Sequence, residues 1–223
     1  MNRLWVANFH GIGTPGEGVP PEEVPYWCPT SLWPDLADAL VGLSSEGQVK
    51  VEITFDDGNL SDLTVALPAL LDRGLKATFL VCSARLGKPG YLTPENLREL
   101  VAAGMEVGSH GHEHVDLRRL DDEGLAFEAR SSRKLIEQAA GAPVRRFALP
   151  FGSYDRRVLA NLHDYESVYS SDAVRARPGR WLVPRHSYVR GWRADDLRRF
   201  ALDEAPPVKR MVQWANGKWK SLR

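Results

Sequence analysis

Short apolar runs alternate along the chain with longer amphipathic segments. Runs rich in β-branched and aromatic residues predict strands, whereas apolar positions that recur every three to four residues predict helices. We expect strands at residues 4–9, 49–55, 77–82, 105–108, 145–148 and 167–170. Helices are expected at residues 32–43, 62–73, 94–103, 121–140, 155–163 and 194–202. The segments 181–184 and 187–189 fit either a strand pair or one bulged strand.

Regular alternation of strands and helices predicts a parallel sheet, either open or closed. The chain has 223 residues, of which 43% are hydrophobic, so it can bury one substantial core. We expect one domain over residues 1–205 and a C-terminal tail over residues 206–223. Trp214 and Trp219 of this tail could form a partner or sugar platform, although we expect the tail to pack on the domain as apolar cover.

The charge balance narrows the classes of partner. Lys plus Arg and Asp plus Glu both number 29, so nothing indicates nucleic acid or an anionic membrane, and a neutral substrate is expected. No stretch is long enough for a transmembrane helix, and the first residues lack a secretory signal pattern. Cys28 and Cys82 fit a reduced compartment, so we expect a cytoplasmic protein. The sequence does not indicate an oligomeric state.

Two polar motifs follow predicted strands. The first is Thr54-Phe55-Asp56-Asp57-Gly58, and the second, Ser109-His110-Gly111-His112-Glu113-His114, holds three of the six histidines in the chain. An Asp-Asp-Gly sequence at a strand end is also an ordinary turn. The histidine cluster has no such structural explanation, and the two motifs together indicate a metal site.

Coordination chemistry explains why these residue types belong together. A catalytic zinc site uses three imidazole or carboxylate ligands and leaves one position open. His110 and His114 are four residues apart, so a tight loop or a helical turn can direct both at one ion. Successive side chains on a strand face opposite ways, so one of Asp56 and Asp57 can bind metal while the other accepts a proton.

These motifs, with Phe147-Ala148-Leu149-Pro150-Phe151-Gly152, resemble those of the polysaccharide deacetylases, the NodB-homology carbohydrate esterases. The resemblance covers roughly residues 4–190 and implies a distorted (β/α)7 barrel. It further implies that Asp56 is the general base and that the backbone N–H of Phe151, beside Pro150, helps to hold an oxyanion. The metal ligands implied by the resemblance are Asp57, His110 and His114.

The chain departs from the family pattern in two places. Ala148 stands where many members carry an arginine that orients the catalytic Asp, so we expect Asp56 to lack that partner. The late histidine that serves as general acid is also missing from its usual segment. His186 is one candidate, but we favour His10, because a closed barrel can supply its last strand from the N-terminus, as in the permuted poly-N-acetylglucosamine deacetylase branch.

Two further residues are secondary candidates. Asp172 or Arg185 could orient the catalytic histidine or the base, although a surface salt bridge explains either residue equally well.

The expected activity is metal-dependent hydrolysis of an N-acetyl group on a sugar or polysaccharide, with release of acetate. Zinc is the expected ion, and cobalt, nickel or iron fits the same ligands. Alternatives are an O-acetyl esterase, an amidohydrolase for a non-sugar amide, and a noncatalytic sugar-binding module that keeps its metal. A magnesium-dependent phosphatase is disfavoured by the imidazole ligands.

Overall fold

The structure, a computed structural model, describes residues 3–174 and 176–202. The predicted tail of residues 206–223, with Trp214 and Trp219, lies outside these described residues. The described chain is built around a parallel sheet with the strand order β7-β6-β5-β4-β3-β2-β1-β8. The strands are β1 (Leu4–Phe9), β2 (Lys50–Asp57), β3 (Thr78–Val81), β4 (Glu106–Ser109), β5 (Arg146–Ala148), β6 (Ser167–Ser170), β7 (Leu182–Pro184) and β8 (His186–Ser187).

The sheet closes on itself between its two edges. β7 pairs with β6 at one edge and β8 pairs with β1 at the other, yet only Arg185 separates β7 from β8 in the chain. The backbone N–H of Arg185 donates to Ser170 at 2.9 Å, and that of Tyr188 donates to Asn8 at 2.7 Å, so the chain crosses from one edge to the other. Residues 181–189 are therefore one interrupted strand, and the predicted distorted (β/α)7 barrel is confirmed.

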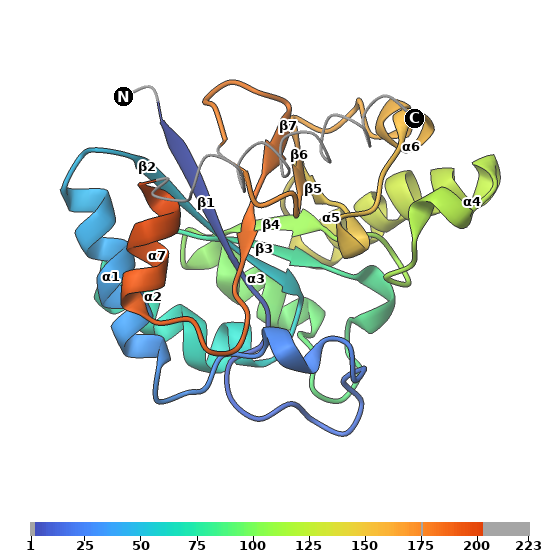
Figure 1. Cartoon of the computed structure of the whole chain (residues 1–223). Coiled ribbons are helices and arrows are strands. Elements are labelled where there is room, and N and C mark those ends of the chain that lie inside the picture. The colour runs from blue at the N-terminus through green and yellow to red at the C-terminus, as the bar shows by residue number, and fades with distance from the viewer. Residues whose placement is uncertain (1–2, 175, 203–223) are drawn as a thin grey trace.

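Helices cover the outside of the barrel. α7 (Ala194–Ala201) packs against α1 (Trp33–Ser45) beside β1 (Figure 1). The other α-helices are α2 (Leu67–Asp72), α3 (Pro94–Ala102), α4 (Asp122–Ala126), α5 (Ser132–Ala140) and α6 (Arg156–Asn161). None of the described helices is both long enough and apolar enough to span a membrane.

Two of the predicted helices contain a π-helical segment, whose turns are wider than those of an α-helix. The predicted helix at residues 62–73 starts with the π-helical segment η2 (Asp62–Ala66) before α2. The predicted helix at residues 121–140 is divided by a second π-helical segment, η5 (Phe127–Ser131), between α4 and α5. Both ends of the helix predicted at residues 121–140 agree with the structure. Asp121 caps the first turn by accepting from the Gly124 N–H, and Gly141 ends the helix with a φ of 67°.

Alternating side chains divide the apolar core into two layers. Trp5, Phe9 and Phe55 belong to the large layer between the strands and the helices, where the Phe9 and Phe55 rings lie 5.6 Å apart. The smaller layer fills the barrel interior and consists of Leu4, Val6, Leu80, Ala148, Tyr169, Ala176 and Val183. Because side chains alternate along a strand, Asp56 and Phe55 face opposite layers, and Asp56 faces the interior.

Candidate active site

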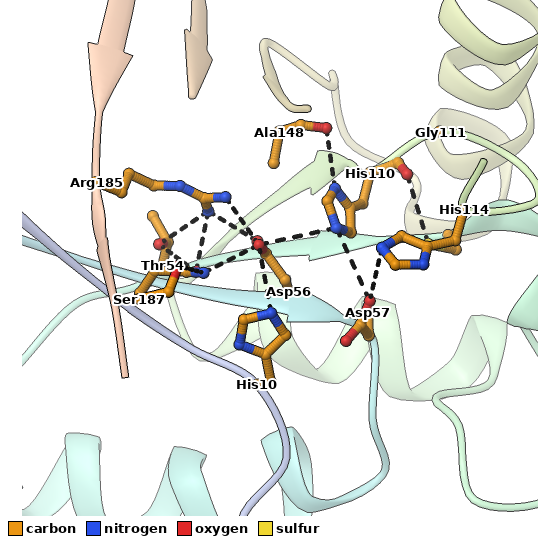
Figure 2. Close-up of polar contacts among 12 residues, drawn as sticks. His10, Thr54, Asp56, Asp57, His110, Gly111, His114, Ala148, Arg185 and Ser187 are labelled. Carbon is orange, nitrogen blue, oxygen red and sulfur yellow. Dashed lines mark hydrogen bonds and ion pairs between the residues drawn. The ribbon is translucent and has the colours of Figure 1, made fainter. Parts of the chain in front are cut away.

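The C-terminal ends of three strands, β1, β2 and β4, position the candidate catalytic residues. Asp56 and Asp57 end β2, and His10 follows β1. His110 and His114 follow β4. These side chains converge at one end of the barrel, where parallel barrels usually carry their chemistry (Figure 2). The long segment between β1 and α1, which contains η1 (Val24–Tyr26), continues from this end of β1 (Figure 1).

Asp57, His110 and His114 form a cluster that can hold a metal ion. One ligand atom from each residue lies within 4.8 Å of the other two. The Asp57 Oδ1 atom is 3.8 Å from His110 Nε2 and 3.7 Å from His114 Nε2. Ligand atoms held about 2 Å from zinc in a tetrahedral arrangement lie about 3.4 Å apart, so the observed spacing needs only a small contraction.

The environment of Asp57 also fits a cation. The side chain is fully buried, yet its two carboxylate oxygens accept no hydrogen bond from the described residues. A buried carboxylate without donors is costly unless an ion neutralises it. Asp57 and His114 also have positive φ angles of 80° and 58°, which are uncommon outside glycine and cluster at functional sites. The three residues therefore fit a divalent metal.

His110 is held in the tautomer that a metal ligand requires. Its Nδ1–H donates to the Ala148 carbonyl at 2.9 Å, which leaves the Nε2 lone pair facing Asp57. Burial lowers the pKa of His110 to about 4, an effect partly opposed by the negative charge of Asp56. The imidazole is therefore neutral, and able to donate its lone pair, over the whole neutral range.

Asp56 is held by the protein on its interior side. Arg185 donates from Nη1 to Oδ1 and from Nη2 to Oδ2, both at 2.8 Å, and the Asn8 amide donates to Oδ2 at 3.0 Å (Figure 2). Burial alone would raise the pKa of Asp56, but the positive charge and the hydrogen bonds of Arg185 hold that pKa well below its usual range. The carboxylate is ionised and fixed in one orientation.

Asp56 lacks the motif arginine at position 148, but it has an arginine partner from another strand. Ala148 removes the arginine from β5, but Arg185 at the junction of β7 and β8 reaches the same carboxylate. Arg185 is itself fully buried and stacks over the Tyr169 ring at 5.2 Å, so it is not part of a surface salt bridge. The sequence marked Arg185 only as a secondary candidate, because its approach to Asp56 depends on barrel closure.

Asn8 was missed by sequence reasoning. Its amide binds Asp56 and the Ser187 hydroxyl, each at 3.0 Å, and its carbonyl oxygen accepts from Arg185 at 3.0 Å and from Thr54 at 2.8 Å. A signal was available in the pattern of β1, because Leu4 and Val6 face the apolar interior and Asn8 is the next residue on that face. A polar residue at such a position requires polar partners.

The two candidate general acids lie on opposite faces of the sheet. His10 Nε2 is 4.0 Å from Asp56 Oδ2, and the His10 ring lies 4.9 Å from Tyr26. His186 is next to Ser187, which faces Asn8 in the interior, so His186 points outward. There its ring stacks 5.5 Å from Phe200 of α7. Only His10 is brought beside Asp56.

Comparison with known proteins assigns the chain to a family. A sequence profile described as polysaccharide deacetylase matches residues 44–169, which is more than half of the chain. The chain belongs to the polysaccharide deacetylase family. The matched residues include Asp56, Asp57, His110 and His114, so the family motifs coincide with the cluster that the fold assembles.

Individual members of the family are related over about half of the chain. YxkH of Bacillus subtilis is 30% identical over 49% of this chain and 39% of its own length. The chitooligosaccharide deacetylase of Sinorhizobium fredii is 33% identical over 52% of this chain and 53% of its own length. The chain thus spans between about two fifths and half of the length of these relatives.

Solved structures share the fold over nearly the whole described chain. The Streptococcus pyogenes deacetylase PplD, in complex with acetate, superposes with a TM-score of 0.76 over 89% of this chain and 98% of its own chain, at 19% identity. IcaB from Ammonifex degensii superposes with a TM-score of 0.69 over 91% and 97%, at 21% identity. These likenesses establish the barrel, which the family profile covers only in part.

The remaining predicted residues follow β5 and β6. Pro150 and Phe151 lie in η6 (Pro150–Gly152), directly after β5, and Phe151 has a φ of 57°. The Phe151 ring is 57% exposed and lies 4.5 Å from the His114 ring. Asp172 follows β6 and accepts hydrogen bonds from Tyr154 and Ser170, each at 2.7 Å. The prediction that Asp172 orients the catalytic histidine gains no support from these two bonds.

A second buried ion pair adjoins the metal cluster and was also missed. Glu23 binds Arg85 through Oε1–Nη2 at 2.6 Å and Oε2–Nη1 at 3.2 Å. Burial would raise the pKa of Glu23, but hydrogen bonds from His114 and Arg85 lower it to about 2. Glu23 lies in the loop after β1, for which the sequence gives no regular pattern, so nothing in the sequence linked it to residues 85 or 114.

Proposed function

We propose that the chain is a metal-dependent deacetylase that removes N-acetyl groups from a sugar or polysaccharide and releases acetate. The observation that carries this proposal is the division of labour between adjacent carboxylates. Asp57 is directed at two imidazoles with its lone pairs free of donors, while Asp56 is held separately by Arg185. Membership of the family and the name of the chitooligosaccharide deacetylase among its relatives support the same assignment.

Asp57, His110 and His114 would hold the ion. The mixture of one carboxylate and two neutral imidazoles suits zinc, and cobalt, nickel or iron in the divalent state fits the same donors. When bound, such an ion polarises the acetyl carbonyl and makes a water molecule more acidic at neutral pH. With three protein ligands, a coordination position remains for the substrate or water.

Asp56 would act as the general base. Its carboxylate is ionised at neutral pH, and Arg185 and Asn8 fix its direction from the interior side. His110 Nε2 lies 3.8 Å from Asp56 Oδ2, so the base adjoins the metal cluster. A positioned base of this kind typically accelerates proton transfer by about 10²–10⁴-fold.

His10 would protonate the leaving amine. It lies on the opposite side of Asp56 from the guanidinium of Arg185, and its Nε2 is within 4.0 Å of the carboxylate (Figure 2). An imidazole at this position can act as a general acid when it carries a proton on the nitrogen that faces the leaving amine. The backbone N–H of Phe151, after β5, would supply a donor for the oxyanion.

Acetate release is the direct test. Purified protein is loaded with zinc and incubated with N-acetylated chito-oligosaccharides and with O-acetylated xylo-oligosaccharides, with and without a chelator. We expect acetate from the N-acetylated series, loss of that activity with chelator, and recovery when zinc is added back. Release from the O-acetylated series alone would replace the proposal with an esterase, and no release from either series would overturn both.

A variant separates catalysis from mere sugar binding. Asp56→Asn keeps the shape of the side chain but removes the base, so turnover should fall while zinc content stays at the level of the wild type. Asp38→Asn is a matched control, because Asp38 is an exposed residue of α1 that pairs with Arg73 at 2.6 Å on the outside of the barrel. Normal turnover in Asp56→Asn would contradict the proposed mechanism.

A further inference from the structure

The charged pair of Glu23 and Arg85 touches the metal cluster on two sides. Glu23 Oε1 lies 3.3 Å from Nδ1 of His114, and Arg85 Nη1 lies 3.1 Å from Oδ1 of Asp57. Glu23 and Arg85 are held to each other by two N–O contacts, at 2.6 Å and 3.2 Å. Each member of the pair therefore contacts a different one of the three residues assigned to the ion.

The position of the pair follows from strand order. β3, β2 and β1 are consecutive in the sheet, and Arg85 follows β3, Asp57 ends β2, and Glu23 follows β1. The ion pair thus bridges the loops on either side of the Asp57 strand. Both charged side chains are largely withdrawn from solvent, with 7% and 12% of their surfaces exposed, so water screens their charges only weakly.

The two contacts have opposite consequences for a cation. A carboxylate at Nδ1 of His114 fixes the tautomer, because Nδ1 carries the proton and Nε2 keeps its lone pair for the ion, and its negative charge adds to the attraction for a cation. The guanidinium beside Asp57 acts in the other direction, because a fixed positive charge 3.1 Å from a ligand oxygen repels a divalent cation bound to that oxygen.

Asp57 accepts no hydrogen bond from Arg85, even though the two groups lie within ion-pair distance. The guanidinium donates to Glu23 instead. The donors of Arg85 are therefore directed away from the ligand oxygen, and Glu23 is the residue that turns them away.

We propose that Glu23 and Arg85 tune the cation site with opposite signs, Glu23 strengthening cation binding and Arg85 weakening it. Both are positioning residues, since they act through His114 and Asp57. This tuning presupposes the metal dependence of the proposed function. It also gives the ordered segment between β1 and α1 a part in the site, because that segment carries Glu23.

A competing explanation is that the pair only anchors the loop after β1. In that case Glu23→Gln and Arg85→Met break the same contact and should have the same effect on every property. Tuning instead predicts that the two variants differ in sign, which makes the pair of variants more informative than either alone.

The test measures zinc affinity by competition with a chromophoric chelator, for the wild type, Glu23→Gln, Arg85→Met and the double variant. We expect Glu23→Gln to bind zinc about 10- to 100-fold more weakly, as is usual when an outer partner of a metal-bound histidine is removed. Arg85→Met should bind at least as tightly as the wild type. The double variant should bind more tightly than Glu23→Gln, because the freed guanidinium is then absent.

Two controls accompany the zinc-affinity measurements. Glu95→Gln removes an exposed Glu–Arg pair with the same 2.6 Å N–O distance, and its zinc affinity should equal that of the wild type. The visible spectrum of the cobalt-loaded protein reports the ligand field directly, so Glu23→Gln should shift its bands and Glu95→Gln should not. The double variant removes Glu23 and Arg85 together, so neither is left as a charge without its partner, and it remains measurable if Glu23→Gln folds poorly.

The outcomes separate this inference from the proposed function. If the wild type binds zinc tightly and releases acetate but Glu23→Gln and Arg85→Met lose affinity equally, the tuning is refuted and the function stands. Unchanged zinc affinity in Glu23→Gln refutes the tuning as well. If the wild type binds no divalent metal, the proposed function itself fails.

Discussion

Asp56 and Asp57 are adjacent in sequence, equally buried and each within reach of an arginine, yet their surroundings differ. Arg185 and Asn8 direct three hydrogen bonds at Asp56, whereas Asp57 accepts none from the described residues and faces His110 and His114. Asp56 is held by hydrogen bonds from the protein, whereas the oxygens of Asp57 have an arginine nearby but no hydrogen-bond donor among the described residues. Two identical side chains at the end of one strand can therefore have different neighbours, because successive side chains of a strand point to opposite faces.

The largest expected effects come from exchanging each carboxylate for its amide. Asp56→Asn and Asp57→Asn should each lower kcat/KM for acetate release by at least about 10²-fold. Only Asp57→Asn should also lose bound zinc, because only that variant removes a ligand. Zinc content by elemental analysis, measured beside turnover, checks the difference, and equal metal loss in both variants would break the division between the two residues.

A comparably large effect is expected at His10. His10→Ala should lower kcat by about 10²-fold or more, because the leaving amine then departs without a proton. His186→Ala should retain turnover, since His186 packs outside the barrel against Phe200, and should instead cost about 1 kcal/mol in the free energy of unfolding. Turnover and urea denaturation of both variants provide the measurement. An inactive His186→Ala beside an active His10→Ala would reverse the assignment.

Arg185→Gln should give an intermediate loss of activity with a characteristic pH dependence. In the wild type the pKa of Asp56 is depressed, so its ionised form persists as the pH falls below its usual titration range. Without Arg185, burial raises that pKa, and the acid limb of the kcat/KM profile should move to higher pH. If the acid limb of the kcat/KM profile does not move, the ion pair between Arg185 and Asp56 does not set the pKa of Asp56.

The stability of the same variant tests whether Asp56 depends on its partner. Removing one member of a buried ion pair typically costs about 3–5 kcal/mol, because the remaining charge is uncompensated. The double variant Asp56→Asn/Arg185→Gln should therefore be more stable than Arg185→Gln. Strictly additive losses in denaturant unfolding would indicate that the two side chains act independently.

The smallest effect is expected at Phe151. Phe151→Ala removes the exposed ring beside His114 but keeps the backbone N–H, so kcat should change little and KM should rise a few-fold if the ring contacts the sugar. Steady-state kinetics on a chito-oligosaccharide separate the two constants. A fall in kcat comparable to that of Asp56→Asn would mean that the ring is part of the catalytic machinery.

Local patterns in the sequence were sufficient for the strands and for the metal cluster. Asp57, His110 and His114 follow apolar runs that form β2 and β4, and strand ends in a parallel barrel meet at one side. The residues that contact Asp56 and this cluster from distant parts of the chain could not be predicted from such local patterns. Arg185 lies 129 positions from Asp56 and Glu23 lies 62 positions from Arg85, and no periodicity links residues that far apart.

The arginine partner of Asp56 could not be located from the motif, because the motif places that partner on β5, where this chain has Ala148. In three dimensions a guanidinium needs only to reach the same carboxylate from the barrel interior, and the junction of β7 and β8 offers that approach. The long arginine side chain makes such a relocation compatible with an unchanged base.

The position of Arg185 at the closing seam has a consequence for biosynthesis. Asn8 and Arg185 are separated by 177 residues, and Asn8 and Ser187 by 179, so these contacts carry one of the largest loop-closure costs in the chain. During synthesis from the N-terminus, Asp56 emerges long before the guanidinium that holds it. A nascent chain can therefore bring Asp57, His110 and His114 together before Arg185 reaches Asp56, and the fixed orientation of Asp56 is one of the last features acquired.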